Sequence, residues 1–182
     1  FQTVGFLQQT AVGAGSRRKG FDEPEIIATT GWTTNELDTG ISVANISKQY
    51  DIVSLLIGVN NQYRGRPVSN FEIEFKSLLQ RAIHFAKDKP QHVFVLSIPD
   101  WGVTPFAEGR DRQQVATEID SFNKVCRDIS MQLNCNYIDI TASQRADGNK
   151  VEYLAKDGLH PSGKEYEKWA VKLSEAILLM HI

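Results

Sequence analysis

Cysteine is scarce in this sequence. The 182 residues include two cysteines, Cys126 and Cys135, and they do not have the Cys-x-x-Cys spacing of a zinc or redox site. A disulfide framework and a structural zinc site are therefore disfavoured. We expect two buried free thiols instead.

The sequence also lacks an excess of positive charge and any long apolar run. A formal net charge of −2 gives no cationic surface for a phosphate backbone, so we expect no nucleic-acid partner. No apolar run approaches the roughly 18 residues of a membrane span, so we expect a soluble protein. The first residue is Phe1 rather than Met, which we interpret as a missing upstream segment. Localisation is left open for that reason, with the cytoplasm favoured and secretion kept as the alternative.

What the sequence does contain is an alternation of strand-like and helix-like stretches. Short apolar runs predict strands, and apolar residues at three- and four-residue steps predict helices. The predicted strands are residues 24–29, 51–57, 92–98 and 136–140, and the predicted helices are 34–50, 70–87, 112–133 and 162–180. Because parallel neighbours need helical crossovers, we expect a three-layer α/β/α, flavodoxin-like fold with a mostly parallel sheet. The chain length fits a single domain over residues 1–182.

A cluster of amides follows the predicted strand 51–57. Residues 58–65 read Gly-Val-Asn-Asn-Gln-Tyr-Arg-Gly, directly after the apolar run. Ligands of parallel sheets collect at the carboxyl ends of the strands, where the Asn60 amide could donate to a developing oxyanion. The alternative is a plain turn, because Asn and Gly tolerate left-handed backbone.

A second polar segment, Asp157-Gly158-Leu159-His160, stands near the C-terminus. A carboxylate three residues before a histidine on a Gly-containing turn can bond one ring nitrogen, so that the other takes a proton from a hydroxyl. The alternative is a surface turn that contains histidine by chance.

Together these segments resemble the signature blocks of the SGNH (GDSL-like) hydrolases, a family of serine esterases, lipases and acylhydrolases. Residues 30–34, Thr-Gly-Trp-Thr-Thr, follow the predicted strand 24–29 and resemble the second block. Gly58-Val59-Asn60-Asn61 resembles the third block, Gly-x-Asn-Asp, with Asn61 where the family has aspartate. Asp157-Gly158-Leu159-His160 resembles the last block, Asp-x-x-His.

The resemblance implies a role for four residues. It makes His160 the general base and Asp157 the acid that orients its ring. It makes the backbone N–H of Gly31 and the side-chain amide of Asn60 the donors that hold the oxyanion. No metal ion or organic cofactor is implied.

Three further residues are candidates for substrate contact. Trp32 and Asn61 belong to the matching blocks, and Trp101 lies on the loop after the predicted strand 92–98. For Trp101, packing against its own loop is the alternative explanation.

The first signature block, Gly-Asp-Ser, has no counterpart in this sequence. Ser16 is the only serine before Gly31, and it follows no apolar run, so it is a poor candidate for the nucleophile. Family members place their first strand in the middle of the sheet, and losing it would leave buried strand edges unpaired. We therefore expect a missing N-terminal strand and nucleophile turn; alternatively, residues 1–6 fill the central position and the protein is inactive.

The leading hypothesis is an ester hydrolase that acts on a small-molecule ester, with a Ser-His-Asp triad whose serine is not visible in this chain. The alternative is a non-catalytic ligand-binding domain on the same fold. A nucleotide-binding domain is disfavoured because no Gly-rich phosphate loop follows any predicted strand. The oligomeric state and the acyl and alcohol groups are left open.

Overall fold

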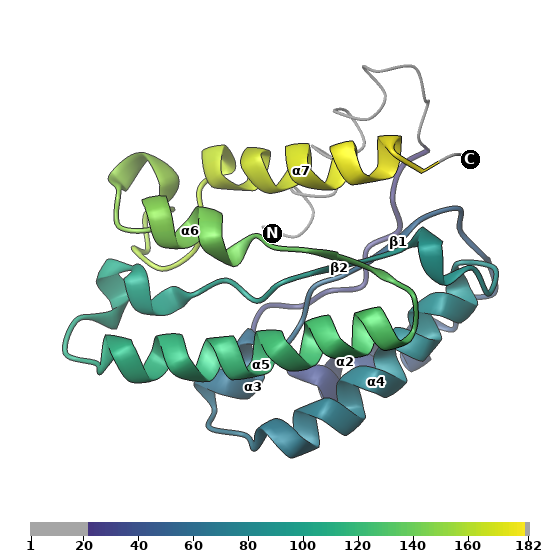
Figure 1. Ribbon diagram of the computed structural model, residues 1–182, viewed down its shortest axis with the longest axis horizontal. Helices are drawn as coiled ribbons and strands as arrows, with labels where there is room; N and C mark the ends of the chain where they lie inside the picture. The colour runs from purple at the N-terminus through teal and green to yellow at the C-terminus, as the bar shows by residue number, and fades with distance from the viewer. Residues whose placement is uncertain (1–21, 181–182) are drawn as a thin grey trace. The chain divides into compact units, whose positions relative to one another are not determined.

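The computed structural model describes residues 22–180 (Figure 1). They divide into two compact units, the larger made of residues 27–100 and 113–141, and the smaller of residues 22–26, 101–112 and 142–180. We describe each unit by itself. The prediction of a single domain over residues 1–182 stays a prediction.

A three-stranded parallel sheet forms the centre of the larger unit. Its order is β1 (Val53–Leu55), β2 (Val93–Leu96) and β3 (Asn136–Ile138), with Val53 opposite Val93 and Val95 opposite Tyr137. The middle strand β2 is buried along its whole length, and burial of the side chains on both faces of the sheet explains its continuous apolar run.

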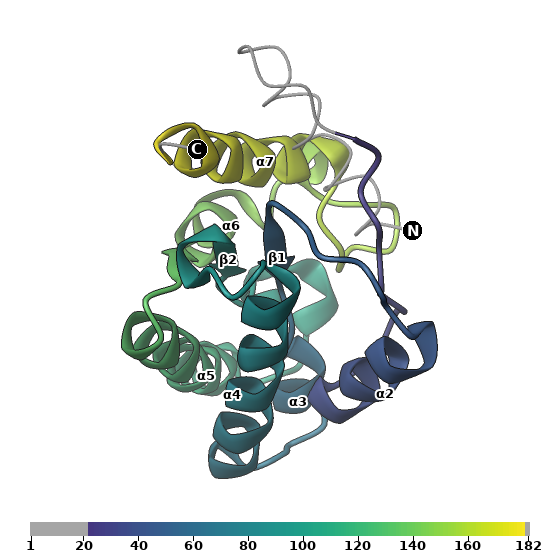
Figure 2. The same ribbon diagram turned by 90° about the vertical axis from the view of Figure 1, so that its right-hand side faces the viewer.

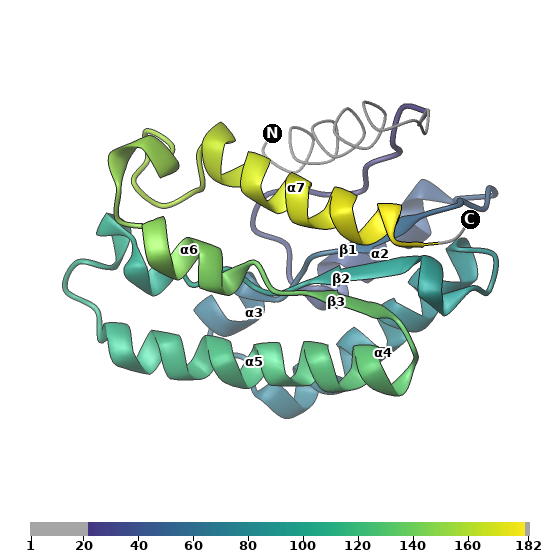
Figure 3. The same cartoon turned by 45° about the horizontal axis from the view of Figure 1, so that its top comes forward.

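Four helices belong to the same unit, and two of them cover one side of its sheet. They are α2 (Thr34–Ala44), α3 (Val59–Tyr63), α4 (Val68–Phe85) and α5 (Arg112–Gln132). Figures 2 and 3 show α4 and α5 running along the same face of the strands. The rings of Phe71 on α4 and Phe122 on α5 lie 4.8 Å apart, so the two helices share one apolar core.

The smaller unit is built around α7 (Gly163–Leu178), with α6 (Thr141–Asp147) beginning at its boundary. One face of α7 is buried through Trp169, Leu173 and Ile177. The buried Glu165 accepts hydrogen bonds from Trp169 Nε1 and from Ser143 Oγ of α6, both at 2.9 Å. These hydrogen bonds offset the cost of burying the Glu165 carboxyl group.

Short 3-10 helices occur in both units. They are η1 (Pro90–His92) in the larger unit, and η2 (Trp101–Val103), η3 (Pro105–Ala107) and η4 (Val151–Tyr153) in the smaller one. Among residues 22–180, no helix is both long and apolar enough to cross a membrane.

Most of the predicted elements are confirmed, although their bounds differ by a few residues. The strands predicted at 51–57, 92–98 and 136–140 and the helices predicted at 70–87, 112–133 and 162–180 are all present. The predicted helix 34–50 ends at Ala44, because Asn45 adopts the left-handed conformation that terminates it. The predicted strand 1–6 and Ser16 lie outside the described residues.

One predicted strand is absent from the described residues, and one segment is helical where no helix was predicted. Residues 24–29 form no strand, although their composition favours one. A strand forms only where it can pair with a neighbouring strand, and residues 24–29 pair with none in the described sheet. The amide-rich segment 58–65, for which a plain turn was the alternative, contains the short helix α3 and buries Asn61 and Gln62.

Both cysteines are free thiols, as predicted, but they differ in burial. Cys126 is buried and Cys135 is half-buried. Desolvation raises the pKa of both thiols, that of Cys135 to about 11, so neither is a thiolate at neutral pH.

Candidate active site

The first predicted oxyanion donor, Gly31, lies in a tight turn of the larger unit. The Trp32 N–H donates to the Thr29 carbonyl at 3.3 Å, and Gly31, at the third position, has φ +88°. A positive φ at that position is typical of a type II turn and favours glycine. The glycine of this segment is therefore explained by backbone geometry before any chemistry is considered.

A second glycine, Gly58, carries the chain from β1 into α3. Its φ is +123°, and a methyl group there would lie 2.6 Å from Ile98 Cδ1 and 2.8 Å from the Phe71 ring. Both the conformation and the space exclude a side chain. Asn60 and Asn61 are thereby placed on a short helix immediately beyond the end of the strand.

Asn60 and Asn61 both bond the segment that follows Gly31. The Asn60 Nδ2 donates to the Trp32 carbonyl at 3.1 Å. The Asn61 Oδ1 accepts from the Thr34 N–H at 3.1 Å, and its Nδ2 donates to the Thr34 hydroxyl at 2.7 Å. Thr34 Oγ1 in turn donates to Glu74. Asn61 is only 1% exposed, so its predicted contact with substrate stays a prediction while its contact with Thr34 is observed.

Arg64 bonds the same turn, a position for which the sequence patterns gave no role. Its Nη2 donates to the Gly31 carbonyl at 2.7 Å, and its Nη1 contacts both carboxylate oxygens of Glu36 at 3.2 and 3.3 Å. Glu36 also accepts from the N–H and hydroxyl of Thr33, at 2.8 and 2.7 Å. The Thr33 hydrogen bonds, reinforced by Arg64, lower the pKa of Glu36 to about 2. The one sequence signal for this role is that Arg64 lies four residues after Asn60. That spacing places two side chains on the same face only if the segment is helical.

The predicted acid and base lie together in the smaller unit. The Asp157 Oδ1 accepts from the backbone N–H groups of Leu159 and His160, both at 3.0 Å, and its Oδ2 lies 2.6 Å from His160 Nδ1. Partial desolvation opposes ionisation of Asp157, but the bonds from His160 and Leu159 outweigh it and lower the pKa to about 2. An ionised Asp157 favours the tautomer with its proton on Nδ1, which leaves the lone pair on His160 Nε2.

The two tryptophans predicted to contact substrate differ in surroundings. Trp32 is half-buried, and its indole lies against Gly40 so closely that a methyl group there would be 2.3 Å from Cη2. With Val43, Ala44 and Thr39 it lines a shallow groove of about 440 Å³ along α2. Trp101, in the smaller unit, is 7% exposed and packs edge-on against Phe106, with ring centroids 6.1 Å apart. The substrate role of either residue stays a prediction.

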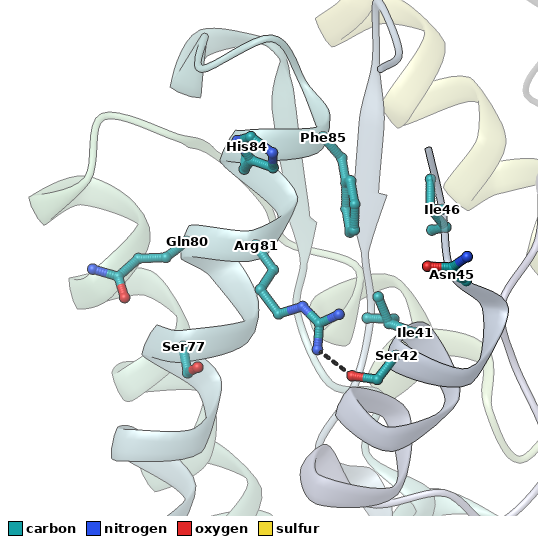
Figure 4. Close-up of a pocket in the computed structure, with 9 residues that line it drawn as sticks. All are labelled: Ile41, Ser42, Asn45, Ile46, Ser77, Gln80, Arg81, His84 and Phe85. Atoms are coloured by element: carbon teal, nitrogen blue, oxygen red, sulfur yellow. Dashed lines mark hydrogen bonds between the residues drawn. The ribbon is translucent and has the colours of Figure 1, made fainter. Parts of the chain in front are cut away.

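A second groove, of about 460 Å³, lies between α2 and α4 (Figure 4). Its most prominent charge is Arg81, whose Nη1 bonds the Asp38 carboxylate at 2.6 Å and the Ser42 hydroxyl at 3.1 Å. The Asp38 carboxylate pairs with that charge, so Arg81 is a weaker candidate for binding an anionic group than the donors at the Gly31 turn.

The structure thus groups the predicted residues into two sets. Gly31, Trp32, Asn60 and Asn61 lie within the larger unit, and residues 157–160 with Trp101 lie within the smaller one. Among residues 22–180, no cluster of three or more histidine, cysteine or acidic side chains could hold a metal ion. The first set contains amide hydrogen-bond donors, and the second contains an imidazole whose Nδ1 faces a carboxylate.

Comparison with known proteins gives a consistent picture. The profile of the GDSL-like lipase/acylhydrolase family matches residues 8–168. No curated protein matches the chain. Solved structures do, and they confirm the α/β fold predicted from the sequence.

Three of those structures illustrate the range of sequence identity and structural similarity. The lipase/acylhydrolase from Enterococcus faecalis is 20% identical, with a TM-score of 0.67 over 94% of this chain and 84% of that one. The acetylxylan esterase Axe2 from Geobacillus stearothermophilus is 20% identical, with a TM-score of 0.64 over 82% and 69%. The α/β hydrolase LAE5, from the metagenome of Lake Arreo, is 16% identical, with a TM-score of 0.72 over 95% and 81%.

Proposed function

This chain belongs to the GDSL-like lipase/acylhydrolase family, and from that premise we propose that it hydrolyses carboxylic esters by acyl transfer to a serine that lies outside residues 22–180. The observation that carries the proposal is the 2.6 Å bond between Asp157 Oδ2 and His160 Nδ1. An ionised carboxylate at that distance favours the tautomer with the proton on Nδ1, which is the one that a general base needs.

In the first half of the reaction, His160 Nε2 takes the proton of the serine hydroxyl as the serine oxygen attacks the ester carbonyl carbon. The tetrahedral intermediate then collapses, the bond to the alcohol oxygen breaks, and His160 returns the proton to that oxygen. Asp157 stays ionised and stabilises the imidazolium. Water repeats the sequence on the acyl-enzyme, which releases the acid and restores the serine.

The oxyanion of each intermediate is assigned to Gly31 and Asn60. One N–H of the Asn60 amide donates to the Trp32 carbonyl, which leaves its second N–H as a donor beside the Gly31 turn. Donors fixed before the reaction cost no reorganisation when the negative charge develops. The buried Asn61 supports them by holding Thr34.

We propose small-molecule esters as the substrate class. One solved structure with this fold is named an acetylxylan esterase, and another a lipase/acylhydrolase. The apolar wall that Trp32 forms along α2 suits the hydrocarbon part of such an ester, and Trp101 is proposed as a second contact. The steps above use protein side chains, the backbone N–H of Gly31 and water.

The absence of a Gly-Asp-Ser segment from the 182 residues favours one alternative, a non-catalytic domain that binds an ester or glycan with the same groups. That alternative predicts saturable binding without turnover.

Hydrolysis of short-chain nitrophenyl esters by the purified protein, after its intact mass and N-terminal peptide are recorded, separates the two. We expect turnover in the wild type and a loss of about 10⁴-fold or more in His160→Ala. The matched control is His84→Ala, because His84 also pairs with a carboxylate, that of Asp88 at 3.3 Å, and should leave the rate unchanged. Activity that survives in His160→Ala would refute the base assignment.

A further inference from the structure

The segment from Gly31 to Thr34 is held by three side chains of one short stretch. Asn60 bonds the Trp32 carbonyl, Asn61 bonds Thr34, and Arg64 bonds the Gly31 carbonyl. Arg64 is the C-cap of α3, and its own N–H donates to the Asn60 carbonyl at 3.1 Å. The guanidinium and the Asn60 amide are therefore fixed to the same helical turn.

We propose that Arg64 is a positioning residue, which holds the Gly31 turn at a fixed distance from Asn60 so that the two oxyanion donors keep their relative placement. This inference rests on the proposed function. Glycine has the widest backbone freedom of any residue, so a turn built on Gly31 keeps its geometry only if its neighbours are anchored. The Arg64 bond anchors the peptide on the C-terminal side of Gly31.

Glu36 and Thr33 explain why Arg64 adopts this position. Glu36 receives two hydrogen bonds from Thr33 in a capping box at the start of α2, so its carboxylate is fixed before Arg64 reaches it. The planar guanidinium contacts Glu36 through Nη1 and Gly31 through Nη2, a fork that a lysine ammonium cannot reproduce.

An ordinary surface ion pair would predict a different outcome. The Arg64 and Glu36 side chains are 43% and 37% exposed, and pairs of this kind contribute little to stability. If Arg64 acts only as such a pair, removing it changes neither the rate nor the turn. If it positions the donors, removing it lowers kcat with little change in KM, because the oxyanion exists only during the reaction.

The experiment compares Arg64→Met, Arg64→Lys and the control Arg81→Met in nitrophenyl acetate hydrolysis. Arg81 is a matched control because it also bonds a backbone carbonyl and a carboxylate, both of Asp38, and its bonds reach α2 at Asp38 and Ser42 rather than at residues 31–34. We expect kcat to fall about tenfold to hundredfold in Arg64→Met at nearly constant KM, with Arg64→Lys in between and Arg81→Met unchanged.

Hydrogen exchange of the peptide that contains residues 30–34 provides a second readout. We expect faster exchange in Arg64→Met than in the wild type or Arg81→Met. An active wild type with an unchanged kcat in Arg64→Met would overturn this inference alone. An inactive wild type would overturn the proposed function, and the exchange rates would then decide whether Arg64 holds the turn.

Discussion

The proposed oxyanion half of this protein, around Gly31 and Asn60, and its proposed acid–base half, Asp157 and His160, are built in opposite ways. Asp157 and His160 are three residues apart, and the Asp157 carboxylate bonds two backbone N–H groups of their turn as well as the His160 ring. The Gly31 turn depends on two side chains that are distant in sequence. Asn60 is 28 residues from its partner Trp32, and Arg64 is 33 residues from its partner Gly31. The first half is a local motif, and the second exists only after the fold has formed.

The difference in burial follows the difference in construction. The His160 and Asp157 side chains are 40% and 49% exposed, whereas Asn61 and Thr34 are in the interior. A change in the local half should therefore alter the chemistry and leave the fold intact. A change at the buried Asn61 or Thr34 should affect stability as well as chemistry, since these polar groups are desolvated.

Asp157→Asn is the sharpest test of the local half and has the largest expected effect. The asparagine Oδ1 can still accept the two backbone N–H groups, but its NH₂ would face His160 Nδ1 and favour the tautomer with the proton on Nε2. We expect kcat/KM to fall about 10³- to 10⁴-fold with an almost unchanged Tm. The control is Asp88→Asn, and a loss of less than tenfold in Asp157→Asn would show that the tautomer does not matter.

Asn61→Asp breaks the distributed half by restoring the aspartate that the family pattern has there. The Asn61 amide donates to Thr34 Oγ1, whose own proton goes to Glu74, and a carboxylate cannot donate. The variant would place two carboxylates around one hydroxyl proton in the interior. We expect the free energy of unfolding to fall by about 1–3 kcal/mol at pH 7.

The pH dependence of Asn61→Asp checks that explanation. A buried, poorly paired carboxyl has a raised pKa, so the deficit should shrink as the pH falls and the group regains a proton to donate. Denaturant unfolding at pH 7 and pH 5 measures both values. A variant as stable as the wild type at pH 7 would contradict the assigned hydrogen-bond directions.

The smallest expected effect is the acid sensitivity that the two halves share. Hydrogen bonds lower the pKa of Glu36 from 4.5 to about 2. Hydrogen bonds likewise lower the pKa of Asp157 from 3.8 to about 2. Because the folded pKa lies below the unfolded one, the ionised groups stabilise the fold above about pH 4.5, and this contribution is lost as the pH falls toward 2. We expect Tm of the wild type to fall more steeply over that range than Tm of Glu36→Gln or Asp157→Asn. Identical slopes in all three proteins would contradict the assignment.

The sequence predicted the contact between Asp157 and His160 and the long elements well. Helices such as 70–87 carry an apolar face that repeats over several turns, and the Asp-x-x-His spacing contains its own geometry. The buried strand β2 was equally clear, because its continuous apolar run has no other explanation in an α/β chain.

The parts that failed depend on tertiary contacts. Residues 24–29 have the composition of a strand but no partner in the described sheet. The helix α3 has two asparagines among its five residues and therefore a poor propensity, so only its surroundings stabilise it. The role of Arg64 was invisible for the same reason, because its bond to Gly31 spans 33 residues.

The most direct test of the central claim is labelling with a fluorophosphonate probe, in which a serine oxygen forms a bond to phosphorus and fluoride leaves. We predict one adduct in the wild type, on a serine outside residues 22–180, and labelling at least about a hundredfold slower in His160→Ala. Equal labelling rates in the two proteins, an adduct on a serine within residues 22–180, or no adduct in the wild type would contradict the account.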